Sequence, residues 1–139
     1  MRSVSISARA DSAYVDSSAL VKLVVPEAET PALRQELRAF ERLISSALAR
    51  VEVVRGASRR GPEARARSLR MLAAMNLLTV DDDLLDAAAR LEPQTLRSLD
   101  AVHLASALSI GDALVAVVTY DRRLADAARG VGLAVLSPA

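Results

Sequence analysis

The sequence predicts an α/β protein, a three-layer α/β/α sandwich with a mainly parallel central sheet. Segments of strand character alternate with helices or helix pairs along the chain, which is the order of βαβ units. The segment Ala113–Thr119 is continuously apolar, as expected of a strand covered on both faces. The 139 residues suit one domain, and no internal repeat or linker divides them.

The first half of the chain is expected to begin with a flexible segment. Residues 1–12 are polar and lack a period, so we place a single domain at 13–139. Ser17 or Ser18 is a candidate cap for the first helix, and Thr30–Pro31 opens the second. The elements expected up to residue 76 are strand 13–16, helices 17–24 and 31–40, strand 43–45, and helices 46–58 and 62–76.

Leucine and methionine spacing orients the last of these helices. Leu69, Leu72 and Met75 recur at about every third residue and are expected to face inward.

In the second half, Asp81–Asp83 begin a helix, as the helix dipole prefers, and Ser98 caps another. The remaining elements are expected at strand 77–80, helices 81–91 and 98–110, strand 113–119, helix 121–129 and strand 133–136.

The composition excludes several classes of function. There is no cysteine, which excludes thiol catalysis, disulfide scaffolds and cysteine-ligated zinc. Aromatic residues make up only 2%, which disfavours a stacking platform for single-stranded nucleic acid. Neither a signal peptide nor an apolar run of membrane-spanning length is visible, so we expect a cytoplasmic protein without membrane contact.

Four acids stand out by their position. Asp16 and Asp121 follow strands at the edge where open parallel sheets place their functional crevice. Glu52 and Asp100 interrupt apolar helical stretches. Each acid also has a structural interpretation, as a helix cap, a turn residue or a partner of Arg55. If the four converge, a divalent cation relieves their repulsion, and oxygen ligands favour Mg²⁺ or Mn²⁺. Metal ions held by such carboxylates can activate water for the hydrolysis of phosphodiester bonds.

Four segments containing these acids resemble, in order, those of PIN domains, and in particular the VapC-type toxin ribonucleases of bacteria. The segments cover the chain from about Ala13 to Leu136 and are Tyr14–Lys22, Ser45–Glu52, Leu99–Ala107 and Val118–Leu124.

The resemblance implies a PIN-like fold and a Mg²⁺-dependent endoribonuclease, with Mn²⁺ as a substitute. Asp16, Asp100 and Asp121 would be metal ligands, and Glu52 would bind metal or act as a base. Ser17 and Thr119 would brace the carboxylates. The resemblance also implies RNA hydrolysis that leaves a 5′-phosphate, a homodimer, and a toxin neutralised by a cognate antitoxin. An arginine of that antitoxin would enter the acidic site, and helices 19–25 and 32–40 would offer it an apolar groove.

The stretch Arg55–Arg70 holds six arginines and one acid, a local net charge of +5 (6 − 1). Two interpretations stay open: a phosphate-binding rim for RNA, or a solvated helix face whose long side chains cover apolar surface. The candidate RNA-binding residues are Arg59, Arg60, Arg65 and Arg67.

Other functions fit less well. A receiver domain needs a lysine near a late strand, whereas the single lysine is Lys22. A haloacid-dehalogenase-like phosphatase needs an acid two residues after the first, where Ser18 stands. The remaining alternative is a catalytically silent PIN-fold module that binds RNA or protein.

Overall fold

The computed structural model describes residues 10–139 and confirms the predicted α/β/α architecture. The expected flexible segment falls mostly on residues 1–9, which lie outside the described residues. The described elements are β1 (Ser12–Val15), α2 (Ser17–Val24), α3 (Thr30–Leu37), β2 (Arg42–Ser46), α4 (Ala49–Ser58), α5 (Pro62–Ala73), β3 (Asn76–Leu78), α6 (Asp82–Ala89), α7 (Ser98–Ser109), a 3₁₀ turn at Gly111–Ala113, β4 (Leu114–Val118), α8 (Arg122–Gly130) and β5 (Val135–Leu136).

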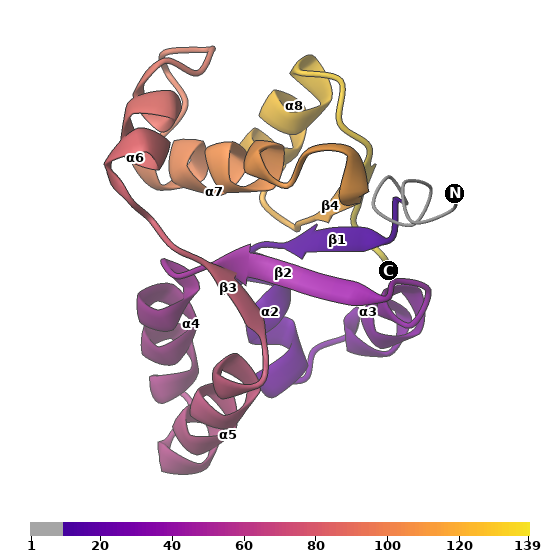
Figure 1. The fold of residues 1–139 in the computed structure, drawn as a ribbon. Helices are drawn as coiled ribbons and strands as arrows, with labels where there is room; N and C mark the ends of the chain where they lie inside the picture. Colours follow the sequence, from indigo (N-terminus) through magenta and orange to yellow (C-terminus); the bar gives the residue numbers. More distant parts are fainter. Residues whose placement is uncertain (1–9) are drawn as a thin grey trace, which may run out of the picture.

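The five strands form one sheet in the order β3-β2-β1-β4-β5, and every neighbouring pair is parallel. Helices α2 to α5 cover one face and α6 to α8 cover the other, as Figure 1 shows below and above the sheet. Strand order reverses around β1, since the chain first builds outward through β2 and β3 and then returns to add β4 and β5. In open parallel sheets this reversal marks the edge where ligands bind.

The alternation of side chains along β1 separates two apolar cores. Ala13 and Val15 face the core under α2 to α5, and Tyr14 faces the core that α7 and α8 share. All three residues are fully buried. Side chains along β1 therefore alternate between the two cores. Asp16 is the next residue after the strand and lies where β1 leaves the sheet, between the helical layers.

Two predicted helix caps are wrong, and helix α3, which begins at Thr30, has no side-chain cap either. The side chain of Asp16, and not that of Ser17 or Ser18, caps α2 by accepting from the amide of Ala19. Helix α7 begins after Arg97 with no side-chain cap, although Ser98 was the expected one. An aspartate accepts this backbone bond as well as a serine does, so residue type alone does not choose between neighbours.

The inward face of α5 also differs from the prediction. Leu72 is buried and Met75 packs on the core, but Leu69 is 44% exposed. The buried stripe is formed by Ala64, Ser68 and Leu72. These residues recur every four positions, and small side chains let α5 approach α4 closely. The leucine spacing was misleading because the large residue at 69 lies beside this stripe.

Within residues 10–139, no helix is both long and apolar enough to span a membrane.

Candidate active site

The carboxyl ends of β1, β2 and β4 bring the predicted acids to one edge of the sheet. Asp16 follows β1 directly, and Asp121 lies three residues beyond β4. Strand β2 leads through a short turn into α4, whose first turn holds Glu52. In Figure 1 the arrowheads of β1 and β2 point toward this edge. Helix α7 supplies Asp100 from its first turn.

Asp16 is the most enclosed of the four acids, with 3% of its surface exposed. Its Oδ1 accepts from the Ser18 hydroxyl at 2.7 Å and from the amide of Ala19 at 3.1 Å. Its Oδ2 accepts from the Thr119 hydroxyl at 2.5 Å. Burial raises the pKa of Asp16, while the hydrogen bonds from Thr119 and Ser18 oppose that rise. The carboxylate is therefore fixed in direction by donors from two neighbouring strand ends.

Glu52 is half-buried and is held through one oxygen. Its Oε1 accepts from the Ser17 hydroxyl at 2.6 Å and lies 2.7 Å from Nε2 of His103. Burial opposes ionisation of this carboxyl, but the bonds from His103 and Ser17 together outweigh it, so the pKa of Glu52 lies below its usual range. Glu52 is thus charged at neutral pH and does not pair with Arg55.

Asp100 is buried, and its Oδ2 has no hydrogen-bond partner among the described residues. Burial raises the pKa of Asp100, and the charges of Asp121 and Asp16 raise it further. His103, when it is protonated, and Arg97 act in the opposite direction. These mutual effects place the three aspartates in one electrostatic neighbourhood. A buried carboxylate oxygen without a donor is costly unless a cation or a bound ligand satisfies it.

Asp121 caps α8, and its Oδ1 accepts from the amides of Arg123 and Leu124 at 2.9 and 3.2 Å. The structural interpretation as a helix cap therefore applies to this residue. Its Oδ2 has no hydrogen-bond partner within residues 10–139, so capping leaves one oxygen for another role.

The donor chemistry fits a hard divalent cation. Carboxylate oxygens of Asp16, Asp100 and Asp121 are the ligands that Mg²⁺ and Mn²⁺ prefer, and Oδ2 of Asp100 is an orphaned anion among like charges. No three acidic or histidine side chains of residues 10–139 converge closely enough to form a finished metal cage.

The four arginines predicted to bind RNA lie on α4 and α5, not among the acids. Arg59 follows the end of α4 and Arg60 the next position, while Arg65 and Arg67 are on α5. All four are exposed. Arg67 donates with Nε and Nη2 to the carbonyl of Val24 at 3.1 and 2.8 Å, which satisfies the C-terminal end of α2. Arg67 therefore has a structural role in addition to any contact with RNA.

Sequence reasoning gave Tyr14 and Ser18 no role at this edge. Tyr14 and His103 form a buried pair that reaches Glu52, and Ser18 bonds both Asp16 and the amide of Tyr120. Exposed cations also stand next to the acids, namely Arg97 before Asp100 and Arg122–Arg123 after Asp121. Their position within three residues of a predicted ligand was a usable signal. The contact between Tyr14 and His103 was not, since 89 positions separate them.

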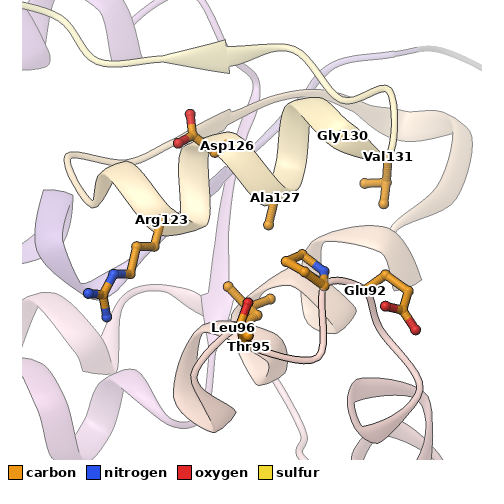
Figure 2. A pocket seen from close by; sticks show the side chains of 9 residues that line it. Glu92, Thr95, Leu96, Arg123, Asp126, Ala127, Gly130 and Val131 are labelled. Carbon is orange, nitrogen blue, oxygen red and sulfur yellow. The ribbon is translucent and has the colours of Figure 1, made fainter.

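A cavity of about 740 Å³ lies beside the site and contains none of the four acids. It is bounded by α8 and by the loop that leads into α7 (Figure 2). Figure 2 shows Ala127 pointing toward this loop, whereas the carboxylate of Asp126 points to the opposite side of α8. The cavity carries both signs of charge and is mostly apolar, so it is not the place where a phosphate would be cleaved.

The chain is similar to known proteins over most of its length. The family model of the PIN domain matches residues 13–130. Ribonuclease VapC46 of Mycobacterium tuberculosis is 50% identical over 125 residues, which are 90% of this chain and 96% of that protein. Ribonuclease VapC47 of the same species is 42% identical over 130 residues, with the same coverage of 90% and 96%.

Solved structures agree in fold. VapC20 of Mycobacterium tuberculosis, a toxin that cleaves the sarcin–ricin loop, superimposes with a TM-score of 0.73 at 17% identity, over 91% of this chain and 99% of that one. A toxin–antitoxin complex from Klebsiella pneumoniae contains a chain with a TM-score of 0.71 at 22% identity, over 91% and 98%. At these identities the likeness concerns the fold alone.

Proposed function

The chain belongs to the PIN domain family and, within it, to the VapC ribonucleases, and from this premise we propose that it is a Mg²⁺-dependent endoribonuclease toxin that a cognate antitoxin neutralises. One observation carries the proposal: Asp100 presents a buried oxygen without a partner, in the field of Asp16 and Asp121. A structural carboxylate would be paired, whereas a site built for a cation leaves an oxygen open.

The chain's own residues divide the work of hydrolysis. Asp16, Asp100 and Asp121 would hold the metal, which when bound supplies positive charge to the phosphate and to the attacking water. Glu52 is charged, and its Oε2 has no partner among the described residues, so it can accept a proton from that water. The water oxygen bonds to phosphorus, the bond to the 3′ oxygen breaks, and that oxygen takes up a proton from solvent, so the products are a 5′-phosphate and a 3′-hydroxyl.

Metal removal is the direct test of this function. We expect excess chelator to stop RNA cleavage by the purified chain, and added Mg²⁺ or Mn²⁺ to restore it, because nothing else neutralises the acids and the phosphate together. Cleavage is measured on a labelled RNA, with metal-free buffer as the control. Cleavage at an unchanged rate in excess chelator would contradict the proposal.

For RNA binding we propose the exposed arginines at the end of α4 and on α5. Arg59 lies seven residues after Glu52, about two turns further along the same face of α4 and roughly 10 Å away. That spacing allows RNA held at the acids to reach it. Arg97, Arg122 and Arg123 stand nearer to the acids and form a second candidate contact.

Salt dependence distinguishes the two groups of arginines. If Arg59, Arg60 and Arg65 each contact a phosphate, their triple replacement by alanine lowers the salt slope of single-stranded RNA binding by about 2, since each contact contributes about 0.7. Arg67 is left in place because alanine there also removes its bonds to Val24. Replacement of the exposed Arg38 and Arg90 is the control. An unchanged slope in the triple variant would assign these arginines to solvated surface.

The proposed antitoxin and a homodimer complete the assembly. In helices 19–25 and 32–40, which were expected to offer an apolar groove, Leu20, Val24, Leu33 and Leu37 are buried in the core, and Val21, Leu23 and Phe40 are partly buried. An antitoxin would instead meet Val51 and Leu99, which are 56% and 51% exposed and directly precede Glu52 and Asp100. Light scattering of the purified chain tests the homodimer.

A further inference from the structure

A buried histidine links the interior of the protein to Glu52. Nδ1 of His103 lies 2.6 Å from the hydroxyl of Tyr14, and its Nε2 lies 2.7 Å from Oε1 of Glu52. The chain of contacts joins β1, α7 and α4. Tyr14 is fully buried and His103 is 3% exposed, so bulk water does not compete for these bonds.

The direction of each hydrogen bond follows from counting protons. Tyr14 has one hydroxyl proton to donate, and its oxygen lies 2.6 Å from Nδ1 of His103. Of the two serine hydroxyls near it, that of Ser106 donates to the carbonyl of Val102 and that of Ser45 makes no hydrogen bond. Nδ1 therefore accepts, so the ring proton of the neutral imidazole is on Nε2. Nε2 donates this proton to the charged carboxylate of Glu52. Tyr14 thus selects the histidine tautomer that faces Glu52 with a donor.

The two oxygens of Glu52 become unequal as a result. Oε1 receives the Ser17 hydroxyl and the His103 ring, while Oε2 receives no donor from the described residues. The Glu52 side chain is 25% exposed, so it is reachable from solvent. A carboxylate fixed through one oxygen keeps a defined orientation while the other oxygen stays available.

We propose that His103 is a positioning residue, held in its Nε2–H tautomer by Tyr14, which fixes Oε1 of Glu52 so that Oε2 faces the reacting water. This inference rests on the function proposed above for Glu52. His103 itself does not touch RNA or metal. It acts in the way that outer hydrogen-bond partners orient the groups of an active site.

The tautomer is measurable without any activity assay. The chain has a single histidine, so ring-¹⁵N-labelled protein without an affinity tag gives one unambiguous pair of nitrogen resonances. Near neutral pH and without RNA, we expect a protonated Nε2 and an unprotonated Nδ1 that accepts a hydrogen bond. The Tyr14→Phe variant should lose the hydrogen-bond shift at Nδ1. A protonated Nδ1 in the wild-type protein would overturn the proposal.

Two replacements of His103 separate positioning from packing. The amide nitrogen of glutamine takes the place of Nε2, whereas the shorter asparagine mimics Nδ1 and does not reach Glu52. Loss of an outer hydrogen-bond partner costs about 10–100-fold in activity. We expect a kcat loss of this size in His103→Asn, with KM for RNA nearly unchanged, and substantial rescue in His103→Gln. Equal kcat values in the two folded variants would overturn the positioning role.

Tyr14→Phe has a matched control in the other tyrosine of the chain. Tyr120 also donates a hydrogen bond of 2.6 Å, part-buried, but to the carbonyl of Pro138. Tyr14→Phe should lower kcat by about 10-fold, at the lower end of the range for an outer partner, and Tyr120→Phe should leave it unchanged. Equal kcat values in these two variants would contradict the inference about His103. Lack of metal-dependent cleavage by the wild-type protein would instead contradict the proposed ribonuclease function, and the resonances of His103 would still report its tautomer.

Discussion

The Asp100→Asn variant is expected to lose more than about 100-fold of its RNA cleavage rate and to become more stable at neutral pH. Loss of an outer partner of a metal site already costs about 10–100-fold, and removal of a direct ligand costs more. The stability gain has a separate cause: a buried, unpartnered carboxylate beside Asp16 and Asp121 destabilises the folded state when it is ionised. An amide keeps the shape and removes the charge.

The pH dependence of this gain identifies its origin. The pKa of Asp100 is raised in the folded protein. Between the ordinary and the raised pKa, the folded state therefore binds more protons than the unfolded state. The stability contributed by this group is complete below the ordinary aspartate pKa of about 3.9 and is lost as pH rises through the raised value. We therefore expect a melting temperature above wild type near pH 7 and no gain near pH 3.

The exposed Asp86 on α6 provides the matched control, because Asp86→Asn removes the same charge from a surface position outside the site. Asp86→Asn should change neither cleavage nor stability. A marked loss of stability in Asp100→Asn near pH 7 would show that Asp100 is structural and would contradict its assignment as a ligand.

Asp16 should behave differently from Asp100 in stability, although it should lose as much activity. An asparagine still caps α2 through its carbonyl oxygen. The amide nitrogen, however, replaces the oxygen to which the Thr119 hydroxyl donates. The relief of repulsion is offset by this lost acceptor, so we expect a melting temperature close to wild type. Equal stability gains in the two variants would mean that the Thr119 bond contributes nothing.

The fold was predictable from sequence because its signals are local. A buried parallel strand such as β4 shows as a continuous apolar run, and breaks such as Gly61–Pro62 separate helices without any knowledge of tertiary contacts. The errors arose where neighbouring residues compete for one position. Asp16 and Ser17 are both good helix caps, and only the packing of β1 against β4 brings Thr119 to Asp16 and settles which one is used.

The acids of the site were predictable from their places at strand ends, but their partners were not. Ser17 was expected to brace a carboxylate, yet which one it contacts depends on how α4 is placed: its partner is Glu52 and not the adjacent Asp16. His103 lies three residues after Asp100 on the same helix, yet its bonds to Tyr14 and Glu52 lead to β1 and α4. Periodicity describes one helix at a time, and a contact between helices and a sheet requires the assembled core.

Neutralising the acids is also expected to weaken binding of the proposed antitoxin, because an arginine guanidinium can take the place of the metal ion in this site. An arginine can donate two parallel bonds to a carboxylate, and Oδ2 of Asp100 and Oε2 of Glu52 have no donor among the described residues. Val51 and Leu99, exposed beside these two acids, can cover the apolar stem of that arginine. Inhibition and metal binding would then compete for the same oxygens.

The expected effect of this competition is large. Breaking a buried, hydrogen-bonded charge pair costs about 2–5 kcal/mol, so we expect Asp100→Asn to weaken the complex with the co-purified antitoxin by about 30-fold or more. Asp86→Asn should leave the affinity unchanged. Replacing the antitoxin's arginines one at a time should identify a single position whose loss abolishes inhibition. If every arginine can be replaced without loss of inhibition, or if Asp100→Asn binds as tightly as wild type, the antitoxin does not act through these acids.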